Sequence, residues 1–289
     1  MALVVASEAH DVELPVEISQ PVEISQPIIP PRRDEELSLL QNQKQQQQQQ
    51  QQRGSRRPRK KSSERNKRHG ARNQHRHKFF IKWLLKTFNI KEDQSSSQEQ
   101  QQQHILDVAG GRGEVSARLT MCHRQQVIMV DPRPADIVDC YERIVLPRIP
   151  NKWQARLEEK RSINPDFIKD TIKSRFQQLV TTFDEYKFNN NVKLRNAIED
   201  SSLIIGLHAD GATEAIVDAA LKYNKPFVVV PCCVFPSFFP SRTILVESKT
   251  VPVRTHEQFC LFLLRKDPRF VMEELPFDGR NIAIWWDGK

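Results

Sequence analysis

The residues best suited to chemistry lie in one short stretch, ILDVAGGRGEVSARL, at positions 105–119. Three of the chain's nine glycines, Gly110, Gly111 and Gly113, fall within four positions of it. A glycine-rich turn between a strand and a helix lets a ligand approach the backbone closely. The spacing fails the GxGxxG pattern of dinucleotide sites, because Ser116 stands where the third glycine or alanine belongs. No GK[ST] follows, so the stretch is no Walker A loop either.

Two acids accompany these glycines. Asp107 ends the first predicted strand, and Asp131 ends the second, QVIMVD, 18 residues beyond Gly113. An acid after the second strand accepts hydrogen bonds from ribose hydroxyls, since one carboxylate can take two donors. The pattern therefore favours a nucleoside-containing cofactor over a tight turn that serves only the backbone.

A second set of reactive side chains follows two later strands. His208 and Asp210 lie in GLHADG, and Cys232 and Cys233 lie in PCCVFPSFFPSR. His208 is the candidate general base, because imidazole titrates near neutrality, and Asp210 is expected to orient it or to contact a substrate. The open alternative is that His208 only hydrogen-bonds the loop backbone.

The stretch DVAGGRG resembles motif I of the class I methyltransferases, which bind S-adenosylmethionine. Ala109 is a mild departure, since that family usually has glycine there. GLHADGATEAIVDAAL and PFVVVPCCVFP resemble the methyltransferase-25-like subfamily, as do HKFFIKWLLKTF and LPFDGRNIAIWW. This subfamily includes a eukaryotic tRNA 2′-O-methyltransferase branch. The resemblance covers residues 80–289 in patches.

The resemblance implies that the loops after the first two strands hold S-adenosylmethionine, while the loops after the fourth and fifth face the methyl acceptor. The expected cofactor residues are Asp107, Ala109, Gly110, Gly111, Gly113, Asp131, Pro132 and Arg133. The expected substrate residues are Cys232, Cys233, Phe235 and Arg242, in a loop that also carries Phe238 and Phe239. That aromatic loop either stacks a base or forms a lid on the sheet, and the lid is favoured.

The adjacent cysteines allow a sharper hypothesis, a methyl-carrying or metal-binding thiol. Neighbouring side chains are expected to point apart, so the favoured interpretation buries one cysteine and places the other in the pocket. The five cysteines show no CxxC spacing, and no structural metal is expected. They are interpreted as free thiols in a reducing compartment.

Strand-like and helix-like segments alternate along residues 104–289, which predicts a parallel α/β sheet of the Rossmann-like methyltransferase type with a C-terminal antiparallel hairpin. The third strand is hard to place, and QLVTTFD (178–184) is the candidate, with Asp184 as the adenine contact. Trp153, Trp285 and Trp286 are interpreted as core or hairpin residues. Thr255 and Gln258 have the spacing of a capping box, so a helix is expected to begin there.

The remaining sequence divides into an extension over residues 1–78, a leading helix over 79–90, a polar insert over 91–103 and the catalytic core over 104–289. Glutamine-rich, repetitive composition predicts disorder in the extension. Residues 53–78 hold twelve Lys or Arg and one acid, so the net charge of +8 originates in this basic arm. The arm suggests RNA contact or nuclear import, and the location is nucleus or cytoplasm. No membrane span or secretory signal is expected.

The leading hypothesis is therefore an S-adenosylmethionine-dependent methyltransferase acting on RNA, with tRNA as one candidate. The alternatives are a protein methyltransferase and a non-catalytic S-adenosylmethionine-binding sensor or scaffold.

Overall fold

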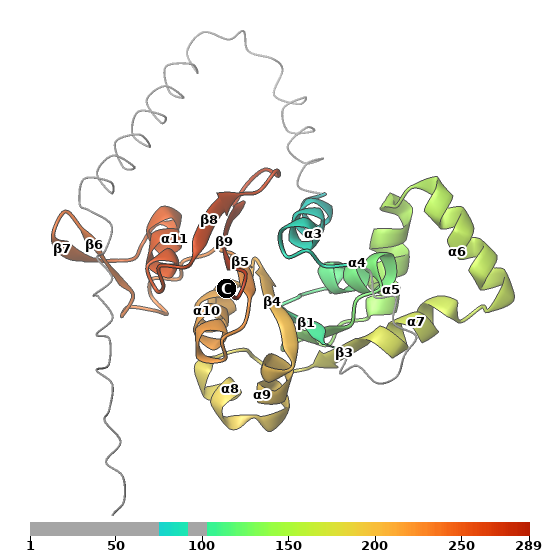
Figure 1. Ribbon diagram of the computed structural model, residues 1–289, viewed down its shortest axis with the longest axis horizontal. Coiled ribbons are helices and arrows are strands. Elements are labelled where there is room, and N and C mark those ends of the chain that lie inside the picture. Colours follow the sequence, from blue (N-terminus) through green and yellow to red (C-terminus); the bar gives the residue numbers. More distant parts are fainter. Residues whose placement is uncertain (1–74, 92–102) are drawn as a thin grey trace, which may run out of the picture. The chain divides into compact units, whose positions relative to one another are not determined.

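The computed structural model describes residues 75–91 and 103–289. Within them, seven strands form one sheet in the order β3-β2-β1-β4-β5-β9-β8. Six strands run in the same direction and β9 runs against them, pairing antiparallel with both β5 and β8 (Figure 1). The strands are β1 (His104–Val108), β2 (Val127–Val130), β3 (Phe176–Leu179), β4 (Ser201–Leu207), β5 (Phe227–Val230), β8 (Val271–Glu274) and β9 (Ile282–Trp286). The predicted fold class, an α/β fold with a mostly parallel sheet and an antiparallel C-terminal hairpin, is confirmed.

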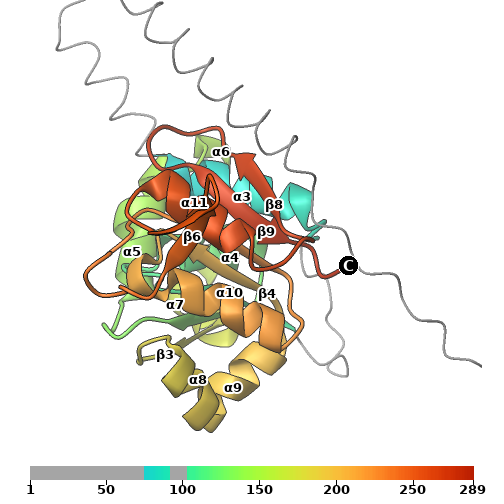
Figure 2. The ribbon, with the colours of Figure 1, turned by 90° about the vertical axis from the view of Figure 1, so that its left-hand side faces the viewer.

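Helices cover both faces of the sheet, as Figures 1 and 2 show. One face carries α8 (Glu185–Asn190), α9 (Val192–Glu199), α10 (Thr213–Lys222) and α11 (His256–Leu264). The other face carries α3 (Arg76–Thr87), α4 (Glu114–His123), α5 (Ile137–Cys140) and α7 (Phe167–Arg175), with α6 (Asn151–Ile163) packed beside α7. A π-helical turn (Tyr141–Val145) and two 3-10 turns (Leu146–Arg148 and Asp210–Ala212) complete the helical elements.

Strand side chains alternate between the two faces, because successive residues of a strand point in opposite directions. Leu106 and Val108 pack against the α10 side, whereas Ile105 packs against α3 and α4. In β5, Phe227 and Val229 face the α10 side, and Val228 and Val230 face the α3 and α4 side. Burial on both faces explains why these strands are continuous apolar runs rather than alternating ones.

The leading helix α3 packs on the first helix of the core. Its buried residues are Phe80, Ile81 and Leu84, which share a cluster with Val115 and Leu119 of α4. The helix begins three residues before the predicted start at residue 79. The α3 surface continues into an aromatic group formed by Trp83, Phe88 and Trp285.

Two expectations about the middle of the chain are corrected. The third strand is Phe176–Leu179 rather than 178–184, because the chain leaves the sheet after Leu179. Its sequence FQQL is polar and half-buried, as suits an edge strand, and so lacks the apolar run that marks the inner strands. Trp153 is 54% exposed on α6, with the Arg156 guanidinium over its ring, and is not a core residue.

The sequence analysis also missed a separate antiparallel hairpin, β6 (Thr243–Val246) and β7 (Lys249–Pro252). The capping box at the start of α11 is confirmed, since the Thr255 side chain accepts from Gln258 N and the Gln258 side chain accepts from Thr255 N. The predicted disorder of the extension, the glutamine run, the polar insert from residue 92 to 102 and most of the basic arm lie outside the described residues.

Candidate active site

The loops predicted to carry the chemistry follow β1, β2, β4 and β5, which are neighbouring parallel strands. Their carboxyl ends meet at one edge of the sheet, and the order reverses between β1 and β4, the usual position of a ligand in an open α/β sheet. Hydrogen bonds tie these loops to adjacent strands: Ala109 N donates to Val130 O, and His208 N donates to Val230 O.

The three glycines of the first loop are needed for different reasons. Gly111 and Gly113 have φ values of +61° and +81°, a conformation that favours glycine. A Cβ at Gly110 would lie 2.6 Å from Met129 Sδ, and one at Gly113 would lie 2.1 Å from Ile137 Cδ1. Around Gly111 there is open space, with the nearest atom, of Arg133, 3.9 Å away. Ala109 also adopts a left-handed conformation, with φ +56°.

Asp131 organises this loop from the end of β2. Its Oδ2 accepts from Gly111 N at 2.9 Å, and its Oδ1 accepts from Arg133 N at 2.9 Å and Arg133 Nε at 3.2 Å. Burial alone would raise the pKa of this carboxyl, but the Arg133 side chain and the two backbone donors outweigh burial and lower it. Arg133 itself is 76% exposed, and the neighbouring Pro132 is exposed too. An exposed arginine side chain therefore covers an ionised carboxylate at the end of β2.

Asp107 lies beneath the same loop and is almost fully buried. Its Oδ2 accepts from the Ser116 hydroxyl at 2.6 Å. Burial raises the pKa of Asp107 to about 7, with a smaller contribution from Asp131 in the same direction, while the Ser116 hydrogen bond opposes the shift. Ser116, which the sequence analysis noted only as a mismatch to a dinucleotide pattern, is thus the partner of the first acid.

Replacing Asp107 with asparagine is expected to change the pH dependence of stability. The pKa of Asp107 is near 4 in the unfolded chain and about 7 in the folded protein, so between these pH values the folded protein binds more protons than the unfolded chain. The free energy of unfolding of wild type therefore falls as pH rises through that window. Asparagine does not titrate, so the free energy of unfolding of Asp107→Asn, relative to that of wild type, should rise by ~2 kcal/mol from pH 5 to pH 8. Urea unfolding at several pH values measures it, and a pH-independent difference would contradict the shifted pKa.

His208 occupies a strained position directly after β4. Its φ is +58°, and that of Asp210 is +47°, unusual values for residues other than glycine. His208 Nε2 is buried without a hydrogen-bond partner. Burial lowers the pKa of His208 to about 4, assisted by the charges of Arg76 and His77 and opposed by Asp210. The imidazole is therefore neutral at pH 7, and its Nε2 has no hydrogen-bond partner.

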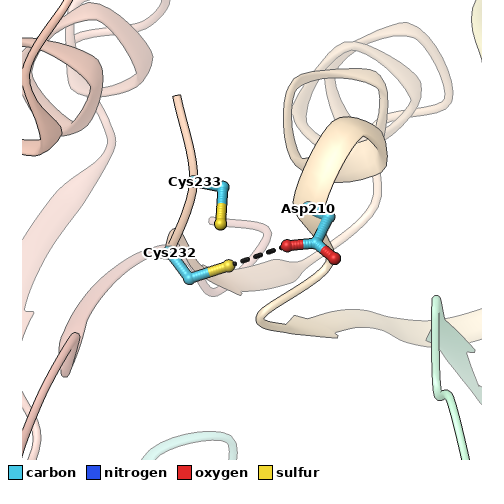
Figure 3. Close-up of side chains that lie close together, drawn as sticks. All are labelled: Asp210, Cys232 and Cys233. Atoms are coloured by element: carbon cyan, nitrogen blue, oxygen red, sulfur yellow. Dashed lines mark hydrogen bonds between the residues drawn. The ribbon is translucent and has the colours of Figure 1, made fainter. Parts of the chain in front are cut away.

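The two cysteines after β5 are placed differently from the prediction. Cys232 is half-buried, Cys233 is exposed, and neither is a core residue. Their side chains do not point apart: both sulfurs and the Asp210 carboxylate lie within 4.8 Å of one another (Figure 3). Cys232 Sγ donates to Asp210 Oδ1 at 3.1 Å. The assumption of opposed side chains holds for an extended strand, whereas residues 231–235 form no regular strand and Phe235 has φ +50°.

Arg242 is buried at the far end of this loop. Its Nε donates to Glu214 Oε2 at 2.5 Å and its Nη1 to Val234 O at 2.9 Å, while its guanidinium lies over the rings of Phe239 and Phe259. These contacts hold the loop against α10 and α11 and leave Nη2 unpartnered. We call residues 231–242 the anchored loop, in which Phe235 is half-buried and Phe238 is 80% exposed.

Sequence reasoning missed Glu214 and His256, which fix the anchored loop from two helices. Glu214 pairs with both Arg242 and Lys266, and His256 Nε2 donates to Pro231 O at 2.9 Å. The capping box preceding His256 was a usable signal for where α11 begins, but nothing in the sequence indicated the long-range pairing. Asp184, the proposed adenine contact, accepts from Thr182 Oγ1 and Lys187 N as the N-cap of α8.

A cavity of about 520 Å³ lies elsewhere, beside β1–β3 and α9, and its lining includes Gln103, Gln177, Leu179 and Lys193. None of the predicted site residues lines it. In the part of the chain that the structure describes, no helix is both long and apolar enough to cross a membrane.

Comparison with models of protein families gives no match, and comparison with curated proteins gives none either. Among solved structures, the methyltransferase domain of bacterial CtHen1 aligns with 74% of this chain and 98% of its own, at 11% identity and a TM-score of 0.39. Magnesium protoporphyrin IX methyltransferase from Synechocystis PCC 6803, solved with bound SAH, aligns with 80% of this chain and 90% of its own, at 9% identity and a TM-score of 0.36. The resemblance to the methyltransferase-25-like subfamily stays a prediction.

Proposed function

We propose that the chain is an S-adenosylmethionine-dependent methyltransferase. The observation that carries the proposal is the joint geometry of the first two loops, in which the Asp131 carboxylate accepts from Gly111 N at the carboxyl edge of a methyltransferase-like sheet. The open space around Gly111 and the exposed Arg133 leave room for a ribose at this carboxylate. The residues that would hold the cofactor are the set predicted from the sequence, from Asp107 to Arg133.

The first turn of α4 favours this cofactor over a dinucleotide. Dinucleotide sites place a pyrophosphate at a helix N-terminus, where backbone N–H groups and the helix dipole attract an anion. Here the Glu114 carboxylate already occupies that turn, paired with Arg118, so a side chain rather than a phosphate takes the favourable place at the helix N-terminus. S-adenosylmethionine carries no phosphate and has a cationic sulfonium, which neighbouring acids stabilise. Ser116 fills the place of the third glycine and holds Asp107.

When bound, S-adenosylmethionine supplies an already activated methyl group. The protein's tasks are then to align an acceptor and to take its proton. His208 suits the second task by position, because its unpaired Nε2 lies after β4, at the same edge as the cofactor loops. Its lowered pKa keeps it in the basic form across the neutral range.

This assignment predicts a pH-independent contribution from His208. Since its pKa lies at about 4, methyl transfer should not lose activity through this group on acidification from pH 8 to about 5.5. The His208→Gln variant should bind S-adenosylmethionine normally but transfer methyl ~10²–10⁴-fold more slowly. Single-turnover transfer rates measured beside calorimetric binding separate the two effects. A variant as active as wild type would leave His208 a backbone-organising residue.

RNA is the favoured acceptor, and the described end of the basic arm supports it. Arg76 and His77 open α3, and His77 Nδ1 lies 3.0 Å from Glu114 Oε2 in the first turn after the glycine loop. Both residues are also close enough to lower the pKa of His208. Arg76 and His77, at the described end of the arm, therefore lie beside the candidate site, where positive charge would attract a phosphate backbone.

The test is transfer of labelled methyl from S-adenosylmethionine to total RNA and, separately, to a protein extract. The proposal predicts label in RNA and salt-sensitive RNA binding that weakens when residues 53–74 are deleted. Label in protein alone would favour a protein methyltransferase. Cofactor binding without transfer to either fraction would favour a sensor or scaffold. If total RNA is labelled, purified tRNA is tested next.

A further inference from the structure

Asp210, Cys232 and Cys233 form a compact set of metal-binding side chains in the described part of the chain. Each offers one donor atom, and the three donors lie within 4.8 Å of one another. They come from two loops: Asp210 follows β4, and the cysteines follow β5 (Figure 3). We call them the thiol–carboxylate cluster.

We propose that the thiol–carboxylate cluster binds a thiophilic divalent cation of the zinc class, with Asp210, Cys232 and Cys233 as its three protein ligands and a fourth position open to solvent. The donor types decide the class of metal. Two sulfurs exclude Mg²⁺ and Ca²⁺, which take oxygen ligands, and favour Zn²⁺, which binds thiolate sulfur and carboxylate oxygen together.

The geometry suits a tetrahedral ion after small movements. With Zn–S bonds of ~2.3 Å and Zn–O bonds of ~2.1 Å, tetrahedral ligands stand roughly 3.6–3.8 Å apart. The Cys232 Sγ to Asp210 Oδ1 distance is 3.1 Å, and the remaining donors are within 4.8 Å, so shifts of about 1 Å or less bring all three into range. Cys233 is exposed and Cys232 is partly accessible, which gives an ion a path of entry.

Hydrogen bonds and an ion pair fix the loops that carry the three donor atoms. The anchored loop is fixed by Arg242 on Glu214 and by His256 on Pro231 O, directly before Cys232. Asp210 lies in a left-handed conformation at the start of a 3-10 turn, where the Thr213 hydroxyl donates to its carbonyl.

Three protein ligands and an open position are the arrangement of catalytic rather than structural zinc sites. The cluster lies at the ends of β4 and β5, and its Asp210 is two residues after His208, where the acceptor is expected. The inference goes beyond the proposed function, since metal binding by these side chains requires no S-adenosylmethionine.

The experiment uses the full chain, stripped of metal and reduced with a phosphine, which does not bind zinc strongly. Zn²⁺ is titrated in competition with a chromophoric chelator, and Co²⁺ is added in parallel to report thiolate ligands by their near-ultraviolet charge-transfer band. Wild type should bind one ion and show the band. Cys232→Ser and Cys233→Ser should each weaken Zn²⁺ binding at least ~30-fold, and Asp210→Asn about tenfold.

Cys122→Ser is the matched control, because Cys122 is a half-buried free thiol on α4 outside the cluster. It should bind as wild type does. Since Cys233 is exposed, its replacement should leave the fold intact, which circular dichroism verifies. Absence of stoichiometric binding, wild-type affinity in Cys233→Ser, or Co²⁺ binding without the thiolate band would each overturn the proposal. None of these results would bear on S-adenosylmethionine binding, which is measured separately.

Discussion

Replacing Gly113 with alanine is expected to destabilise the protein by ~2–4 kcal/mol. The added Cβ would lie 2.1 Å from Ile137 Cδ1, which is buried, so the side chain has little room to withdraw. Overpacking of this kind costs about 1–3 kcal/mol, and the left-handed φ of +81° costs about 1 kcal/mol more for alanine. Because Gly113 is also the N-cap residue of α4, the displacement reaches the cofactor loop, and S-adenosylmethionine affinity should fall as well.

Gly211→Ala is the matched control for this change. Gly211 has no left-handed φ, and a Cβ there would meet only the Phe239 ring, whose Cζ lies at an ordinary contact distance of 3.7 Å. Its stability should stay within ~0.5 kcal/mol of wild type. The double variant Gly113→Ala with Ile137→Val should recover the overpacking part of the loss but not the backbone part. Urea denaturation of all three measures this, and an unaltered Gly113→Ala protein would refute the tight packing of the loop.

Replacing Glu214 with glutamine is expected to cost ~3 kcal/mol, because it leaves the Arg242 charge buried without its partner. The Arg242 side chain is 3% exposed, and Glu214 receives its Nε at 2.5 Å. At about 2–4 °C per kcal/mol for a domain of this size, the melting temperature should fall by ~6–12 °C. The anchored loop should loosen first, exposing its amides to hydrogen exchange.

Two further variants make this prediction specific. Asp139→Asn breaks an exposed ion pair with Arg143, in which the Asp139 side chain is 48% exposed and the Arg143 side chain 80%. It should change the free energy of unfolding by less than ~0.5 kcal/mol. Adding Arg242→Met to Glu214→Gln removes the orphaned charge and should restore part of the loss. Calorimetric melting compares the four proteins. If Glu214→Gln melts like Asp139→Asn, the buried pair does not hold the loop.

The first half of the site was predictable because its signals are local. Gly111, Gly113 and Asp131 are read from a strand, a turn and a second strand of adjacent sequence, and parallel pairing of β1 with β2 then brings them together. The sheet itself was predictable for the same reason, since its inner strands are apolar runs buried on both faces. The edge strand β3 has no such run, and its position was misjudged.

The second half depends on contacts between distant residues. Arg242 was predicted as a substrate residue in an aromatic loop that either stacks a base or forms a lid. Its partner Glu214 lies on α10, 28 residues earlier. The approach of Cys232 and Cys233 to Asp210 depends on backbone angles in a loop without regular structure. Residue types alone indicate neither, since identical sequences in an extended strand would separate the two sulfurs.

The most direct measurement is calorimetric titration of S-adenosylmethionine into the full chain, with Asp131→Ala and Asp136→Ala in parallel. Asp136 is the control, because its exposed carboxylate only caps α5 by accepting from Asp139 N. The account predicts micromolar, one-to-one binding by wild type and by Asp136→Ala. It predicts at least ~100-fold weaker binding by Asp131→Ala, which loses two charge-assisted hydrogen bonds to ribose. A folded wild type that does not bind, or an Asp131→Ala variant that binds equally well, would contradict the proposed cofactor site.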